Sequence, residues 1–151
     1  MSNLIETPAH AAVGRNQAFE LERHQLAMPQ VEIPVTHYLK PNSLEREVRI
    51  PAGVSLTGAI QLFDCINYLT QGEITVLTRN GMERVKAPWC EITPAGTKRV
   101  GYTHTDCIWT SVYITSETDP EKVRTAFTTN DESVYLAHVE ALKLEGSTPC
   151  L

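Results

Sequence analysis

The stretch GVSLTGAIQLFDCINYLTQG, residues 53–72, places Gly53 and Gly72 on either side of a run rich in aliphatic and aromatic residues. Such a run between turn residues is typical of a β-strand. Side chains alternate between the two faces of a strand. One face then carries Ala59, Gln61, Phe63, Cys65, Asn67 and Leu69, and the other carries Ile60, Leu62, Asp64, Ile66 and Tyr68. Both faces are largely apolar, so we expect the outer face to be covered too, by the terminal segments or by another subunit.

Runs of the same character continue on both sides of this stretch. They are short, rich in β-branched and aromatic residues, and cover residues 31–39, 46–52, 59–69, 73–78, 82–87, 90–95, 98–104 and 107–115. Asn80-Gly81 lies between two of them and predicts a tight hairpin, because both residues tolerate a positive φ. Because no helical run separates these strands, the sequence predicts an all-β fold, an antiparallel sandwich or jelly roll.

The two ends of the chain differ from this β-rich centre. Residues 1–30 read as an N-terminal arm with a possible short helix over 16–28, for which Asn16 is the expected N-cap. Residues 118–151 read as a C-terminal helical extension. It has one helix over 118–127, capped by Asp119 and opened by Pro120, and a second over 130–144. The β-barrel is expected to occupy residues 31–117.

Composition narrows the classes of function. The chain of 151 residues carries a net charge of −5 and has no basic run, so we expect no nucleic-acid partner. It has neither an apolar run long enough for a membrane span nor the features of a secretion signal, so we expect no membrane partner, and a cytoplasmic location if the structural role described below does not hold. The cysteines Cys65, Cys90, Cys107 and Cys150 are widely spaced, which favours reduced thiols over disulfides or a zinc site.

The spacing within residues 53–72 resembles the first sequence motif of the cupin superfamily. That motif runs from a glycine through five residues to His-x-His, then to a glutamate and a second glycine, and Gly53, Ala59, Gln61, Cys65 and Gly72 occupy its positions. The second cupin motif, Pro-x-Gly followed by a histidine, is similar to PAGTKR (94–99), in which Arg99 stands at the histidine position. The resemblance covers roughly residues 31–115 and implies an antiparallel cupin barrel.

The same resemblance implies a degenerate metal site. The family's positions for His, His, Glu and His hold Ala59, Gln61, Cys65 and Arg99. A divalent metal needs about three or four imidazole or carboxylate donors, and an arginine cation repels it. We therefore expect no metal, no cofactor and no catalytic residue at these positions.

The resemblance further implies that Gln61, Cys65 and Asn67 line the barrel interior, together with Arg99 at its motif position. A buried polar group needs a hydrogen-bond partner. Mutual hydrogen bonds with water are one solution for Gln61, Asn67 and Arg99, and a small anion or polar ligand is the other.

Other chemical groups along the chain point to no second site. His37, His104, Asp64 and Asp106 could form a relocated cluster, but residues 104–106 read as a polar hairpin tip and a lone strand histidine as a solvated residue. The alternating charges of EREVR (45–49) are typical of a solvated strand face. Trp89 and Trp109 are expected to fill the core or an interface.

The wider run APWCEITPAGTKRVGYTHTDCIWTSVYIT, residues 87–115, also resembles small cupin-like proteins encoded by tailed bacteriophages. That resemblance implies a non-catalytic structural protein of the virion, such as a head-decoration, cement or tail-associated subunit. It would form a homo-oligomer and contact other virion proteins through its terminal arms. A small-molecule-binding module and a metal-independent, isomerase-like cupin enzyme remain as alternatives.

Overall fold

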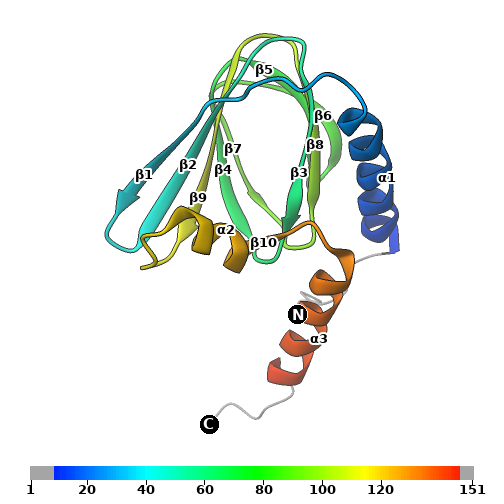
Figure 1. Ribbon diagram of the computed structural model, residues 1–151, viewed down its shortest axis with the longest axis vertical. Helices are drawn as coiled ribbons and strands as arrows, with labels where there is room; N and C mark the ends of the chain where they lie inside the picture. Colours follow the sequence, from blue (N-terminus) through cyan, green and yellow to red (C-terminus); the bar gives the residue numbers. More distant parts are fainter. Residues whose placement is uncertain (1–8, 147–151) are drawn as a thin grey trace.

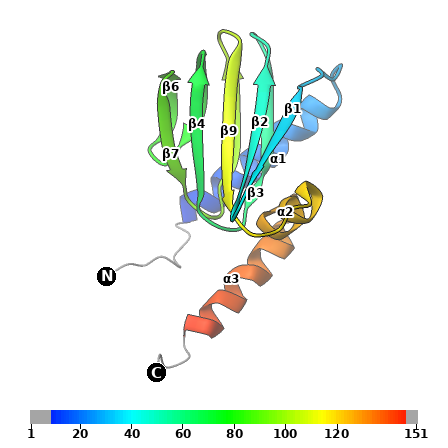
Figure 2. The same ribbon diagram turned by 90° about the vertical axis from the view of Figure 1, so that its left-hand side faces the viewer.

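The computed structural model describes residues 9–146 and shows two five-stranded antiparallel sheets packed face to face, with helices at one end and on one side (Figure 1). One sheet has the strand order β1-β2-β9-β4-β7, and the other has the order β10-β3-β8-β5-β6. Figure 2 shows the first sheet face on, with α1 behind the barrel and α3 extending below it. The prediction of an all-β antiparallel jelly roll with helical ends is confirmed.

The elements follow the turn chemistry of the sequence. Their bounds are α1 Ala9–Leu26, β1 Val35–Lys40, β2 Ser43–Ile50, β3 Ser55–Gln61, β4 Cys65–Gln71, β5 Glu73–Thr78, β6 Gly81–Lys86, β7 Trp89–Thr93, β8 Lys98–Thr103, β9 Cys107–Ile114, α2 Pro120–Phe127, β10 Thr128–Thr129 and α3 Glu132–Gly146. The predicted hairpin at Asn80-Gly81 joins β5 to β6, and Gly81 has the expected positive φ of 104°. Asp119 caps α2 as predicted by accepting a hydrogen bond from the amide of Glu121 at 3.0 Å.

Two predicted elements need correction. The run 59–69 is not one strand, because the chain bends at residues 62–64 and passes from β3 in one sheet to β4 in the other. Phe63 lies in this bend and is exposed, packing edge-on against Phe127 and His138, so it does not share an inner face with Gln61. The first helix begins before residue 16, and Asn16 lies inside α1 rather than at its cap.

The main core fills the space between the sheets. It consists of Val48, Ile50, Val54, Leu69, Ile74, Val76, Cys107 and Trp109. Gly72, which follows β4, packs so tightly against this core that a Cβ atom would stand 2.3 Å from the carbonyl oxygen of Asp106. Its φ of +94° also disfavours any side chain, so the turn requires glycine.

The terminal helices cover the outer face of β3, as expected from its second apolar stripe. Ile60 and Leu62 are buried there with Tyr135 of α3, and Phe19 of α1 packs against them. Arg15 of α1 is 3% exposed and joins the two helices through a fork of hydrogen bonds to the carboxylate of Glu132, at 2.9 to 3.0 Å. Among residues 9–146, no helix combines the length and the hydropathy needed to cross a membrane.

A fully buried lysine ties α1 to the barrel. The ammonium of Lys98 on β8 is 3.0 Å from a carboxylate oxygen of Glu22 and donates to the carbonyl of Gly58 at 2.9 Å. It also lies 4.4 Å from the ring centroid of Phe19. These contacts satisfy a charge that would otherwise be costly to bury.

Candidate functional site

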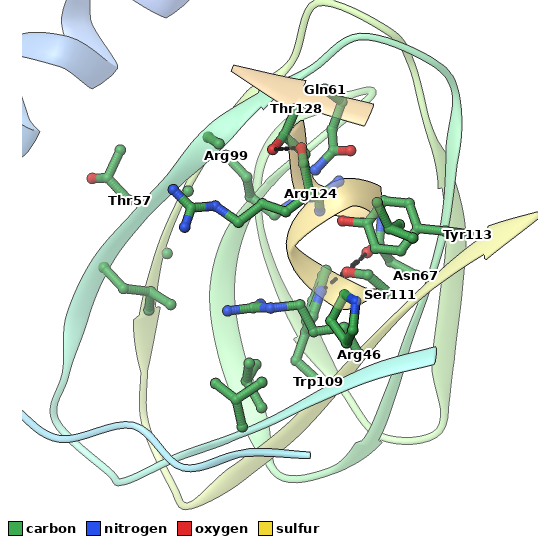
Figure 3. Close-up of a pocket in the computed structure, with 18 of the residues that line it drawn as sticks. Arg46, Thr57, Gln61, Asn67, Arg99, Trp109, Ser111, Tyr113, Arg124 and Thr128 are labelled. Atoms are coloured by element: carbon green, nitrogen blue, oxygen red, sulfur yellow. Dashed lines mark hydrogen bonds between the residues drawn. The ribbon is translucent and has the colours of Figure 1, made fainter. Parts of the chain in front are cut away.

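A cavity of about 520 Å³ lies between the two sheets and next to α2. Both sheets line it, and α2, with the segment that follows it, adds lining residues (Figure 3). Three arginines from three elements reach its wall: Arg46 of β2, Arg99 of β8 and Arg124 of α2. Glu121 is the one acidic residue among the described lining residues, and its side chain is 80% exposed. Arg99 and Arg124 have ion-pair partners in Glu91 and Glu121, at 3.6 and 3.9 Å, so Arg46 supplies the uncompensated positive charge on the wall among the described residues.

Strand register places the lining residues of the first sheet in layers. Residues paired across antiparallel strands share a face. His37 pairs with Arg46, Arg46 with Ser111, and Ser111 with Asn67, so these four form a polar layer. The next layer is apolar, because Val35 pairs with Val48, Val48 with Trp109 and Trp109 with Leu69.

Arg99 enters the cavity from the opposite sheet. Its guanidinium stacks over the ring of Trp109, with 4.9 Å between Cζ and the ring centroid. Its Nη2 donates to the hydroxyl of Thr93 and lies 3.6 Å from a carboxylate oxygen of Glu91. Burial lowers the pKa of Arg99, and the charge of Glu91 opposes that shift, so the group stays a cation. Its Nη1 is buried without a hydrogen-bond partner among the described residues.

Asn67 is the centre of a closed hydrogen-bond network. Its amide oxygen accepts from Ser111 at 2.7 Å and from the indole nitrogen of Trp109 at 3.2 Å, and its amide nitrogen donates to Thr93. Hydrogen bonds within the protein therefore satisfy the side-chain amide of Asn67. For Arg99 they satisfy Nη2 but not Nη1. The buried Oε1 atom of Gln61 has no partner among the described residues.

The other residues at cupin motif positions do not all lie on the cavity wall. Ala59 and Gln61 line the cavity as the cupin resemblance implied, but Cys65 does not. Cys65 is buried instead in a small cluster under α2 with Leu44, Tyr113 and Val123. Burial raises the pKa of its thiol to about 11, which outweighs the charge of Arg99, so the thiol keeps its proton at neutral pH.

These residues do not fit the metal of a typical cupin. The cavity wall offers a methyl group at Ala59, a neutral amide at Gln61 and a cation at Arg99, and the thiol of Cys65 lies off the wall. Among the side chains that the structure describes, those of residues 14–146, no three from His, Cys, Asp or Glu gather closely enough to hold a metal ion.

Sequence reasoning missed Arg46, Arg124 and His37 as cavity residues. The alternation in EREVR suggested a solvated face, but Arg46 points inward between Leu44 and Val48. The usable signal was the period of two over Leu44, Arg46, Val48 and Ile50, which puts a charge in the middle of an apolar stripe. His37 is exposed on β1 and still lines the cavity, so it is more than the solvated residue we expected.

The other members of the relocated cluster have structural roles. His104 is hydrogen-bonded to the hydroxyl of Thr75 at 2.7 Å. Asp64 accepts from the amide of Ala95, and Asp106 accepts from the amide of Ala52, each at 2.9 Å. These residues support turns and do not join His37. Trp109, expected to be a filler, is both a core residue and part of the cavity wall.

Comparison with known proteins shows similarity at the level of the fold. No family model matches the sequence, and no curated protein matches it. Ectoine synthase from P. lautus is similar with a TM-score of 0.52 at 12% identity, over 68% of this chain and 78% of that chain. KdgF from Halomonas sp. has a TM-score of 0.49 at 17% identity, over 62% of this chain and 90% of that chain. A cupin superfamily protein from Desulfitobacterium hafniense DCB-2 has a TM-score of 0.48 at 9% identity, over 58% and 82% of the two chains. The fold is the cupin jelly roll.

Proposed function

We propose that this chain is a metal-independent, non-catalytic binding protein that holds a small organic anion inside its cupin barrel. One observation carries the proposal. Arg46 is half-buried on the cavity wall and has no ion-pair partner among the described residues, and Arg99 lines the same cavity from the opposite sheet. A guanidinium fork in a partly dry cavity suits a carboxylate or a similar planar anion.

The buried thiol and the buried phenol near the cavity are poorly suited to act as a nucleophile or a general base. A nucleophile or general base needs a proton that leaves near neutral pH. The thiol of Cys65 lies off the cavity wall and has a pKa of about 11. The phenol of Tyr113 lies on the wall, and burial raises its pKa to about 12. Both groups therefore stay protonated under physiological conditions.

Calorimetric titration with acetate, benzoate, citrate and inorganic phosphate tests the proposal, with the fluorescence of Trp109 as a second readout. We expect saturable binding of at least one anion, weakened by added salt. Arg46→Gln removes a charge-assisted contact and should weaken binding about 10- to 100-fold. Arg23→Gln is the matched control, because Arg23 is exposed on α1 and lies outside the cavity. Affinity that is equal in Arg46→Gln and the parent protein, or no saturable binding at all, contradicts the proposal.

A role as a structural subunit of a virion is the second candidate, and exposed apolar side chains away from the cavity favour it. Every residue of the edge strand β1 is exposed, including Tyr38 and Leu39, which are not among the described lining residues. Leu136 and Leu144 are exposed along α3, which extends away from the barrel (Figure 2). Such side chains suit contacts with a second copy or with other virion proteins. This candidate predicts that the protein sediments with intact phage particles and self-associates in solution. A monomer that stays in the soluble lysate fraction contradicts it.

A further inference from the structure

We propose that the ligand is an amphipathic monocarboxylate, with one anionic group on an aliphatic or aromatic body, and this inference rests on the proposed binding function. The cavity is divided into a polar level and an apolar level, and the division follows from strand register on both sheets. A ligand that fits both levels carries its charge at one end only.

The polar level holds the anionic group. On one sheet it contains His37, Arg46 and Ser111, which are paired neighbours. On the other sheet Arg99 contributes the unpartnered Nη1, and Gln61 lines the same cavity. Figure 3 shows Arg46, Arg99 and Arg124 reaching into the cavity from different sides. Ser111 donates its hydroxyl hydrogen to Asn67, and the guanidinium groups are the permanently cationic donors on the described cavity wall.

The apolar level lies next to it and belongs to the main core. Val48 and Trp109 form it on the first sheet, and Trp109 borders the polar level, because the guanidinium of Arg99 lies over its ring and its indole nitrogen donates to Asn67. On the second sheet Gly101 pairs with both Leu56 and Val76, and all three line the cavity. A Cβ atom at Gly101 would stand 3.2 Å from Cδ1 of Ile74 and 3.6 Å from Cγ2 of Val76, so apolar side chains of the core pack over this glycine.

This division argues against sugars and polyanions as the main ligands. A sugar would place hydroxyls against Leu56, Val76 and Val48, where the described wall offers them no hydrogen-bond partner. A polyanion would place a second charge there. An alkyl or aryl body instead removes apolar surface from water on both sides of the contact.

A chain-length series of straight-chain carboxylates, from acetate to decanoate, tests the inference by calorimetry. We expect affinity to rise about fourfold with each methylene until the cavity is filled, as for burial of a CH₂ group. Primary alcohols of the same lengths should bind at least tenfold more weakly, because they lack the charge that Arg46 and Arg99 recognise.

Two kinds of variant separate the two levels. Arg46→Gln should weaken binding of every carboxylate by the same factor and leave the dependence on chain length unchanged. Leu56→Trp fills the apolar level, so it should abolish the gain from long chains and leave acetate binding intact. Met82→Trp, on the exposed side of β6, is the matched control and should change neither. If Leu56→Trp does not fold, Leu56→Ala widens the same level and should lower the gain per methylene.

The possible results separate the amphipathic ligand from the proposed anion-binding function. Binding of short anions that depends on Arg46 but does not increase with chain length overturns the amphipathic ligand and leaves the anion-binding function. Alcohols that bind as tightly as carboxylates overturn both. Failure of every carboxylate to bind also overturns both.

Discussion

Replacing Glu22 by glutamine should destabilise the protein far more than its position near the surface suggests. Glu22 is the carboxylate partner of Lys98, whose side chain is fully buried while that of Glu22 is 25% exposed. Removing one partner of a buried pair costs about 3–5 kcal/mol, because the other charge is left uncompensated. Lys98 keeps its hydrogen bond to Gly58, and water reaches Glu22, so we expect about 2–3 kcal/mol for Glu22→Gln.

Urea unfolding followed by tryptophan fluorescence measures this loss. Lys98→Met removes the buried charge itself and should cost only about 1 kcal/mol, because a flexible apolar side chain of similar length takes its place. In the double variant Glu22→Gln/Lys98→Met, no buried ammonium remains to lose its partner. The change at Glu22 should therefore lower the free energy of unfolding by close to zero beyond the effect of Lys98→Met. Glu20→Gln on the exposed side of α1 is the control and should change stability by less than about 0.5 kcal/mol. If Glu22→Gln is as mild as Glu20→Gln, or if the two changes simply add, the reasoning about Lys98 is wrong.

Three further predictions concern the core and its thiols. Gly72→Ala should destabilise the fold by more than about 2 kcal/mol in urea unfolding, because its Cβ would collide with the carbonyl of Asp106; near-parental stability contradicts this. Burial raises the pKa of Cys65 from 9.0 to about 11 and that of Tyr113 from 10.0 to about 12. The folded state thus binds these protons more tightly than the unfolded state, and the stability they contribute is full below pH 9 and falls as the pH rises from about 9 to 12. The urea midpoint should decline over that window with a smaller slope in Tyr113→Phe, and a flat profile counts against it. Iodoacetamide under native conditions should modify the exposed Cys90 and spare Cys65, as mapped by peptide mass spectrometry; equal modification contradicts the burial.

Local chemistry made most of the barrel predictable. Positive φ at Gly53, Gly72, Gly81 and Gly96 occurs where the turn residues of the sequence required it. The cap of α2 at Asp119 was also visible, because a side-chain cap acts within a few residues. The cupin resemblance rested on these turns, and the fold bears it out.

The failures occurred where tertiary contacts overrode local patterns. The bend at residues 62–64 was hidden because Leu62 and Phe63 are apolar, and they pack against the terminal helices instead of continuing a strand. Arg46 was read as a surface charge because alternation alone does not reveal which face is inside. Arg124 reaches the cavity only because α2 lies across the end of the barrel, and no spacing in the sequence encodes that placement.

The helices on the outer wall of β3 have a consequence for how such a barrel changes over evolution. Tyr135 of α3 rests on the turn at Gly96, where even a Cβ atom would stand 2.4 Å from its hydroxyl oxygen. Ile60 and Leu62 lie beneath the two helices and are apolar. A shorter relative without these helices must therefore carry polar side chains at both positions, or another chain must cover them. The polarity of these two residues, one in β3 and one in the bend that follows it, thus indicates whether a barrel of this kind is covered by its own helices or by another chain.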